Sequence, residues 1–152
     1  MSNIYQISSK RLQLSEQLQF FLQFSKTHTI ISRKFDHMGS SVGFTDFILL
    51  YMLYAMPGQK LRPSELADLI GLTPSGVTRL IPPLEKIGMV SRSADPRDAR
   101  IRYISLAPGG ERVLEEAIER AEYVATAIMP TESPKQTARL TQKLEEIRRN
   151  CL

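Results

Sequence analysis

Several residue types are scarce in this chain, and each shortage excludes a class of protein. The 152 residues contain no tryptophan, two histidines and a single cysteine, Cys151. One cysteine excludes a disulfide framework within the chain. His28 and His37 stand outside any Cys/His cluster with the spacing of metal ligands, so we expect no metal site.

Long apolar runs are missing as well. The longest, residues 47–56, is much shorter than the roughly 18 apolar residues that a membrane-spanning helix needs. The first residues, 1–17, lack the apolar centre of a signal peptide. From both observations we expect a cytoplasmic protein that does not contact a membrane.

Motifs for catalysis are also absent. We find no glycine-rich phosphate loop and no nucleophile elbow. Asp95 and Asp98 are three residues apart in an arginine-rich segment, which favours local salt bridges over a catalytic acid pair. We therefore expect no enzymatic activity, no catalytic residues and no cofactor.

The charge of the chain is positive and unevenly distributed. The net charge is +4 and the pI is about 9.4. Residues 75–102 hold six basic against three acidic side chains, whereas residues 111–152 hold seven basic against eight acidic ones. A local basic surplus is typical of a surface that binds nucleic acid, although moderate basicity is also common among other soluble proteins.

The pattern of residues 61–88 predicts a helix-turn-helix. Leu66, Leu69 and Ile70 recur at helical spacing before Gly71 interrupts them. Thr73 is a good N-cap for a second helix, Pro74 suits its first position, and Gly88 is a natural stop. The apolar stripe of this second helix is formed by Val77, Leu80, Ile81, Leu84 and Ile87.

The opposite face of the second helix is polar and includes Ser75, Thr78 and Arg79. A polar N-terminal half of this kind suits contact with base edges in a major groove. Two alternatives remain: these are ordinary surface residues, or Arg79 pairs with Glu65 or Glu85. Pro82 and Pro83 lie late in the helix, where proline kinks helices, so we assign base contact to the part before Pro82.

After Gly88 the pattern changes to that of a β-hairpin. Met89 and Val90 begin one strand, and residues 101–105 alternate on another. Residues 94–100 form a charged turn between them. Four arginines fall in this region, and arginine at a hairpin tip suits a narrow minor groove. The four are Arg92, Arg97, Arg100 and Arg102.

These residues resemble the winged helix of the multiple-antibiotic-resistance regulator (MarR) family. The resemblance is carried by ELADLIGLTPSGVTRL, by LEKIGMVSR and by Asp95-x-Arg97-Asp98-x-Arg100. It implies that Asp95 braces the wing through an arginine pair and that Arg97 enters the minor groove. The family often has arginine where Ala99 stands, so one phosphate contact is expected to be missing. The candidate DNA-binding residues are Ser75, Gly76, Thr78, Arg79, Arg92, Asp95, Arg97 and Arg100.

The rest of the chain reads as flanking helices. We expect helices over 12–35, 46–56, 108–129 and 135–150, with Thr45 as a cap, a central core helix at 46–56 and a short strand at Leu61. The apolar surface at Phe20 and Phe24 is wider than one core contact requires, and Leu140, Leu144 and Ile147 form a stripe that cannot be buried within its own helix.

These elements predict a mostly α protein with a small β-hairpin, a winged helix-turn-helix flanked by dimerisation helices. We expect one domain over 1–152. Residues 37–107 would form the DNA-binding lobe, and residues 10–36 and 108–152 the dimerisation region. A homodimer would bury both helical ends and place its half-sites about one DNA turn, roughly 34 Å, apart.

Two kinds of regulatory input are consistent with the sequence. The resemblance implies a small aromatic effector between the dimer helices and the lobe, where Phe24, His28, Phe47 and Tyr51 are candidates; plain core packing is the alternative. Cys151, next to Arg148 and Arg149, could instead sense oxidants, but it also continues the apolar stripe of the last helix.

The function predicted from the sequence is sequence-specific binding of duplex DNA at a pseudo-palindromic operator. The protein would be a transcriptional repressor that a small-molecule effector releases. The alternatives are an oxidant-sensing regulator and a winged-helix module that binds other proteins without DNA. The density of arginine in the wing favours DNA.

Overall fold

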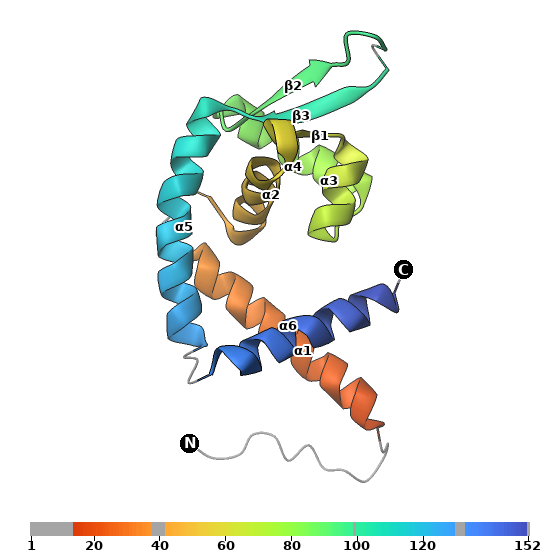
Figure 1. The fold of residues 1–152 in the computed structure, drawn as a ribbon, viewed down its shortest axis with the longest axis vertical. Coiled ribbons are helices and arrows are strands. Elements are labelled where there is room, and N and C mark those ends of the chain that lie inside the picture. The colour runs from red at the N-terminus through yellow and green to blue at the C-terminus, as the bar shows by residue number, and fades with distance from the viewer. Residues whose placement is uncertain (1–13, 38–41, 99, 130–132, 152) are drawn as a thin grey trace.

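The computed structural model describes residues 14–37, 42–98, 100–129 and 133–151. These residues form a mostly helical chain with one small sheet, which confirms the predicted fold class (Figure 1). The helices are α1 (Glu16–Asp36), α2 (Phe44–Ala55), α3 (Pro63–Ile70), α4 (Pro74–Lys86), α5 (Pro108–Ile128) and α6 (Pro134–Arg149), with a short 3-10 helix η1 (Pro57–Gln59). The strands are β1 (Lys60–Leu61), β2 (Val90–Ala94) and β3 (Arg102–Leu106).

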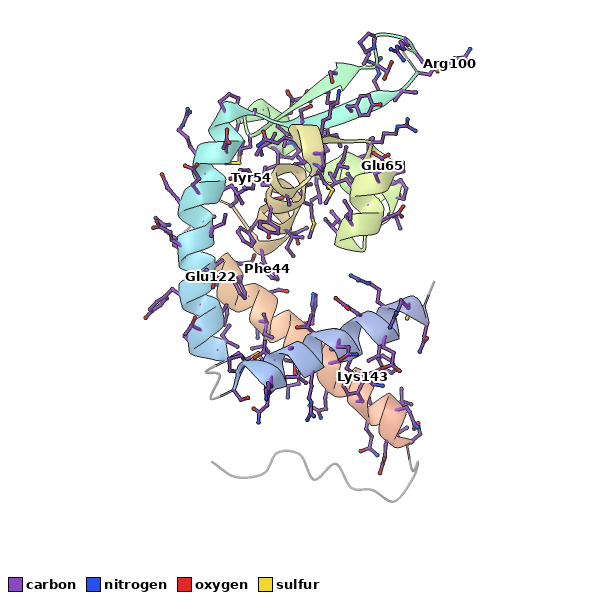
Figure 2. All side chains as sticks on the ribbon, viewed as in Figure 1. Phe44, Tyr54, Glu65, Arg100, Glu122 and Lys143 are labelled. Carbon is purple, nitrogen blue, oxygen red and sulfur yellow. The ribbon has the colours of Figure 1, made fainter. Side chains whose placement is uncertain are left out.

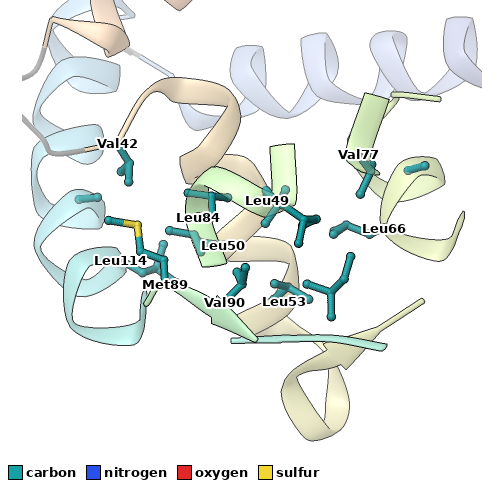
Figure 3. Packing of buried hydrophobic residues seen from close by; sticks show 14 residues of the cluster. Val42, Leu49, Leu50, Leu53, Leu66, Val77, Leu84, Met89, Val90 and Leu114 are labelled. Carbon is teal, nitrogen blue, oxygen red and sulfur yellow. The ribbon is translucent and has the colours of Figure 1, made fainter. Parts of the chain in front are cut away.

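Helix α2 lies at the centre of the core, as predicted. Leu49, Leu50 and Leu53 have no solvent-exposed surface. They pack with side chains from α3, α4, the strands and α5 in one hydrophobic cluster (Figure 3). Because its sequence, FTDFILLYMLYA, is apolar on nearly every side, α2 is stable only when other elements surround it.

The helix-turn-helix forms as α3 and α4. Thr73 caps α4 by accepting a hydrogen bond from the Gly76 N–H at 3.1 Å, and Gly88 takes a positive φ of 72° just after the helix. Both predictions are confirmed. Helix α4 continues through Pro82 and Pro83, which lie on its exposed side while Ile81 and Leu84 are buried against the core. Burial of those neighbours offsets the backbone hydrogen bonds that the two prolines cannot make.

The sheet has the order β1-β3-β2 and is antiparallel throughout. Leu61 pairs with Ile104, which confirms the predicted short strand beside the hairpin. Strands β2 and β3 pair from Val90–Leu106 to Ala94–Arg102. The hairpin projects from one end of the molecule and forms the wing (Figure 1). We call the elements from α2 to β3 the reader lobe.

Helix α5 starts in close contact with the turn between α4 and β2. The Ala107 N–H donates to the Met89 carbonyl at 3.0 Å. A Cβ on Gly109 would stand 2.6 Å from the Gly88 carbonyl oxygen, and one on Gly110 would overlap the Met89 carbonyl. The first turn of α5 therefore packs backbone against backbone on the turn between α4 and β2, and only glycine fits there.

Helices α1 and α6 lie at the end of the molecule opposite the wing (Figure 1). Their apolar side chains are exposed in the single chain: Phe21 keeps 47% of its surface, Leu140 55% and Leu144 46%. This agrees with the prediction that these stripes are not buried within one copy. No helix in the described part of the chain combines the length and apolar character that crossing a bilayer requires.

Two predicted helix starts are wrong. Helix α1 begins at Glu16, with Ser15 as its cap, and Leu14 is not helical. Helix α2 begins at Phe44, so Thr45 lies inside the helix instead of capping it. The Phe44 N–H donates to Asp36 Oδ1 at 2.7 Å. The end of α1 thus supplies the acceptor that starts α2, eight residues away in sequence.

The predicted apolar stripes also need correction at two positions. Leu69 in α3 is 39% exposed, and Ile87 at the end of α4 is 59% exposed. Ala67, which was not assigned to the stripe, is buried in α3 beside Leu66.

The central position of α2 leads to a prediction about stability. Leu49→Ala should lower the free energy of unfolding by about 2–5 kcal/mol, because it leaves a cavity among rigid neighbours. Leu69→Ala, the same change at a half-exposed site, should cost clearly less. Urea denaturation of both variants measures the difference. Equal losses would contradict the central role of α2.

Candidate nucleic-acid interface

The N-terminal half of α4 presents a polar face to solvent. Ser75, Thr78 and Arg79 are exposed and Gly76 is half-buried, while Val77 on the opposite side is buried. The Thr78 hydroxyl donates to the Pro74 carbonyl at 2.8 Å, and Arg79 Nε donates to the Ser75 carbonyl at 3.4 Å. The helix itself therefore orients these side chains, and they remain accessible to a ligand.

The two acids that were possible partners of Arg79 pair elsewhere. Glu65 Oε2 accepts the Arg62 N–H at 2.8 Å and completes a capping box at the start of α3. Glu85 Oε2 lies 3.1 Å from Arg92 Nε. Neither acid forms a salt bridge with Arg79 in the described part of the structure, so the guanidinium is accessible for DNA.

The Glu85–Arg92 salt bridge joins α4 to β2. Both side chains are 41% exposed, and exposed ion pairs stabilise a fold by at most about 1 kcal/mol. The salt bridge matters for geometry, because it ties the wing to α4. Arg92 is a candidate DNA-binding residue, and in the free protein its guanidinium holds the wing to α4.

Aspartates shape the wing tip. Asp95 Oδ1 accepts the Arg97 N–H at 2.8 Å, and Asp98 Oδ1 accepts the Arg100 N–H at 2.9 Å. These turns leave the side chains of Arg97 and Arg100 exposed. Figure 2 shows Arg100 at the far end of the wing. Ala99, where the resemblance suggested a missing contact, lies outside the described residues.

Asp95 is held in its charged form. The hydrogen bond from the Arg97 amide is the largest cause that lowers the pKa of this carboxyl below its ordinary 3.8. The Asp98 amide, the Tyr103 hydroxyl and the charge of Lys60 lower the pKa further. Asp95 is therefore ionised at neutral pH and acts as a fixed acceptor within the turn.

Three residues beside the wing were missed from the sequence. Tyr103 on β3 donates its hydroxyl to Asp95 Oδ2 at 3.3 Å. Lys60 Nζ lies 5.0 Å from the centre of the Tyr103 ring, and the Arg62 guanidinium carbon lies 6.0 Å from it. Lys60 and Arg62 extend the basic surface to the start of α3. The sequence did offer a signal for this basic surface, because cationic residues stand on both sides of Leu61, the residue predicted to form a strand.

The candidate effector residues separate into two groups. Phe47 and Tyr51 stack with ring centres 6.3 Å apart and line a cavity of about 270 Å³ together with Phe35, Phe44, Ile118, Ala121, Glu122 and Ala125. Phe24 is instead 44% exposed on α1 and stacks on Phe20, and His28 is exposed. Neither Phe24 nor His28 lines this cavity, so the structure brings two of the four candidate residues together and the four-residue site stays a prediction.

Cys151 lies after the end of α6, and its thiol is exposed and unbridged. The structure thus leaves the oxidant-sensing hypothesis as a prediction. Among the described residues, no group of three or more His, Cys, Asp or Glu side chains is arranged to hold a metal ion.

The sequence of this interface matches a known protein family. Residues 45–101, from α2 through the wing tip, match the model of the MarR family. The matched segment, which carries all the candidate DNA-binding residues, is therefore similar to the MarR family of transcriptional regulators. The HTH-type transcriptional regulator YdgJ of Bacillus subtilis is 26% identical over 136 residues, which cover 90% of this chain and 81% of that relative.

Solved MarR-like structures share the fold over nearly the whole chain. Sco3205 from Streptomyces coelicolor, solved in complex with DNA, has a TM-score of 0.82 and 21% identity, and the match covers 93% of this chain and 94% of that one. The organohalide-sensing regulator RdhR-CbdbA1625, solved with 2,4-dichlorophenol, has a TM-score of 0.83 and 18% identity, covering 99% and 89%. The likeness therefore includes α1 and α6 as well as the matched segment.

The wing departs from the MarR-family pattern that the sequence suggested. That pattern implied that an arginine pair lets Asp95 brace the hairpin. Here the brace is made by the Arg97 amide and the Tyr103 hydroxyl, with Lys60 and Arg62 nearby but not in a salt bridge with Asp95 within the described residues. The expected arginine partner is replaced by a tyrosine, and Arg97 stays free to project.

The lowered pKa of Asp95 gives the wing a defined dependence on pH. A carboxyl with a depressed pKa stabilises the folded form above its ordinary value, and this contribution is lost as the pH falls through the folded-state pKa. Protection of the Arg97 amide against hydrogen exchange should stay constant from pH 7 to about 4 and decline below about 3.8. In Asp95→Asn this acid-dependent decline should disappear. A decline that begins near pH 6 in the wild type would contradict the assignment.

Proposed function

We propose that the protein is a dimeric repressor that binds duplex DNA, with α4 in the major groove and the wing in the minor groove. One observation carries the proposal: the accessible face of α4 and the arginine-bearing wing are held together. The Glu85–Arg92 pair joins α4 to β2, and a cavity of about 380 Å³ between them is lined by Thr78 as well as by Arg92 and Arg102. The solved DNA complex of Sco3205, which shares this fold, supports the proposal.

The residues have distinct roles in this arrangement. Ser75, Gly76, Thr78 and Arg79 face base edges, where arginine and hydroxyl side chains read hydrogen-bonding groups. Arg97 enters the minor groove, since Asp95 fixes its backbone but leaves its side chain exposed. Arg100 and Arg102 contact phosphates, and Arg92 holds the wing. We assign no catalytic role to the protein.

We infer a homodimer from the exposed apolar side chains of α1 and α6. An apolar face as wide as that of α1, with Leu18, Phe20, Phe21, Leu22 and Phe24 all 44–54% exposed, calls for a partner surface. A two-fold axis through these helices would place two copies of α4 on one side of the duplex. The operator is then pseudo-palindromic, with half-sites roughly 34 Å apart. Binding of chromosomal DNA places the protein in the cytoplasm.

We infer that the cavity at Phe47 and Tyr51 takes a small aromatic effector that releases the DNA. Its volume of about 270 Å³ suits one substituted ring. The predicted site combined its aromatic residues with His28, whereas the charged group that lines this cavity is Glu122. A carboxylate repels another carboxylate and accepts a hydrogen bond from a phenol. The 2,4-dichlorophenol complex of RdhR-CbdbA1625 supports a phenolic ligand.

The effector proposal gives a simple test. A chlorinated phenol at millimolar concentration should raise the melting temperature of the protein, since a ligand that binds the folded state stabilises it. The matching benzoate should raise it less, because Glu122 repels its charge. Glu122→Gln should reduce this preference for phenol over benzoate. Equal shifts for both compounds in the wild type would contradict the role of Glu122.

The DNA proposal is tested with the duplex upstream of the protein's own gene. Fluorescence anisotropy at two salt concentrations should show tight binding to this duplex and weaker binding to a scrambled one, with an affinity that falls steeply with salt. Arg97→Ala should weaken binding and reduce the slope of log K against log salt by about one.

Arg139→Ala, which removes an exposed arginine from α6, is the matched control and should leave affinity unchanged. Unaltered binding by Arg97→Ala at moderate salt would refute the assignment of the wing. Weak and equal binding of both duplexes would call for a genomic selection of bound fragments. A selection that enriches no sequence would refute specific DNA binding and favour a winged-helix module for protein partners.

A further inference from the structure

Tyr103 stands where three parts of the reader lobe meet. It belongs to β3 and pairs with Ser93 of β2, within the wing. Its side chain is half-buried, which sets it apart from the exposed arginines around it. Lys60 of β1 and Arg62, the N-cap of α3, lie against its ring. One side chain thus touches both the wing and the start of the helix-turn-helix.

The hydroxyl of Tyr103 reaches the wing turn through one carboxylate. Tyr103 donates to Asp95 Oδ2 at 3.3 Å, and the other oxygen, Oδ1, accepts the Arg97 N–H at 2.8 Å. The Asp95 N–H in turn donates to the Ile101 carbonyl at 3.0 Å and closes the hairpin. The position of the Arg97 backbone is therefore linked by two consecutive hydrogen bonds to the Tyr103 hydroxyl.

The ring of Tyr103 reaches the other side of the lobe. Lys60 Nζ, 5.0 Å from the ring centre, is within the range of a cation–π contact, and Arg62 lies at the limit of that range. The backbone of Arg62 is in turn fixed by Glu65 in the first turn of α3. A hydrogen bond to Tyr103 is also the largest cause that raises the pKa of Arg62 above its ordinary value.

We propose that Tyr103 is a positioning residue that couples the wing turn bearing Arg97 to the N-terminal end of α3. Its hydroxyl holds Asp95, and its ring is held by the two cations of β1 and α3. The wing then keeps one orientation relative to the helix-turn-helix before DNA arrives, so Arg97 is directed toward the minor groove without an ordering cost at binding. The effect on DNA rests on the proposed function, whereas the coupling itself is a property of the free protein.

The alternative is that Tyr103 only fills space. Its side chain lines the cavity of about 380 Å³ between α4 and the wing, together with Pro63, Thr78, Ile81, Arg92, Arg102 and Ile104. A space-filling side chain would be replaced without effect by phenylalanine, which has the same ring. Tyr103→Phe therefore separates the two explanations, because it removes the hydroxyl and keeps the shape.

The first experiment is a double-mutant cycle in DNA affinity, measured by anisotropy on the operator. Tyr103→Phe should weaken binding about threefold or more, the scale expected for a coupled hydrogen bond. In the Arg97→Ala background, the same change should have no further effect, because the residue that it positions is gone. Tyr54→Phe, which removes a hydroxyl from a 42%-exposed tyrosine on α2, should leave affinity unchanged. Equal losses in both backgrounds, or no loss in either, overturn the proposal.

The second experiment needs no DNA and follows the same turn by NMR. Tyr103→Phe should raise the pKa of Asp95 and speed hydrogen exchange of the Arg97 amide, while the melting temperature stays within a few degrees of wild type. Unchanged exchange and an unchanged pKa overturn the coupling. If both change but the wild type binds no DNA, the coupling stands and the proposed function fails, so the two failures are distinguishable.

Discussion

Burial of one apolar helix is the constraint on which this structure depends. Helix α2 has almost no polar side, so its leucines at 49, 50 and 53 must be covered from several directions at once. The covering elements are α3 and α4 on one side, the small sheet at one end and α5 on another (Figure 3). The surfaces proposed to face DNA are the outer faces of elements whose inner faces serve this core. Recognition is thus built on a rigid base, and few of its side chains contribute to stability.

On the surface proposed to face DNA, carboxylates direct the cationic side chains. Glu85 holds Arg92, Asp95 holds the backbone of Arg97, and Glu65 holds that of Arg62. In the last two cases the acid accepts a backbone N–H and leaves the guanidinium unneutralised. A basic surface can therefore contain several acids and still present its positive charge outward. This explains why the surplus charge of residues 75–102, though modest, is concentrated where a duplex would lie.

Local signals in the sequence were sufficient to predict the helices and strands. They did not predict contacts between residues that are far apart in the sequence. Thr73 and Gly88 mark the ends of α4 because capping and positive φ are properties of a few neighbouring residues. The prediction that Thr45 caps α2 was wrong because the acceptor that starts α2 is Asp36, at the end of another helix. Tyr103 was not assigned a role for the same reason, since its partners lie eight and more than forty positions away.

Periodicity likewise assigned Leu69 and Ile87 to the core, but it does not reveal where a neighbouring helix ends. Of the four effector candidates, only the two on α2 share a cavity, because residues one helical turn apart stay together.

The glycines at the start of α5 give the molecule a mechanical property. Backbone contact between Gly110 and Met89 leaves no side chain that could yield, so the end of the recognition helix and the start of α5 move as one body. Helix α5 has 21 residues and is about 32 Å long, so a tilt of about 5° at its far end shifts the reader lobe by roughly 3 Å. A shift of that size is comparable to one base-pair step. A tilt of α5 would therefore carry α4 and the wing together, and a small change among the helices far from the wing would shift both of them relative to the grooves of a bound duplex.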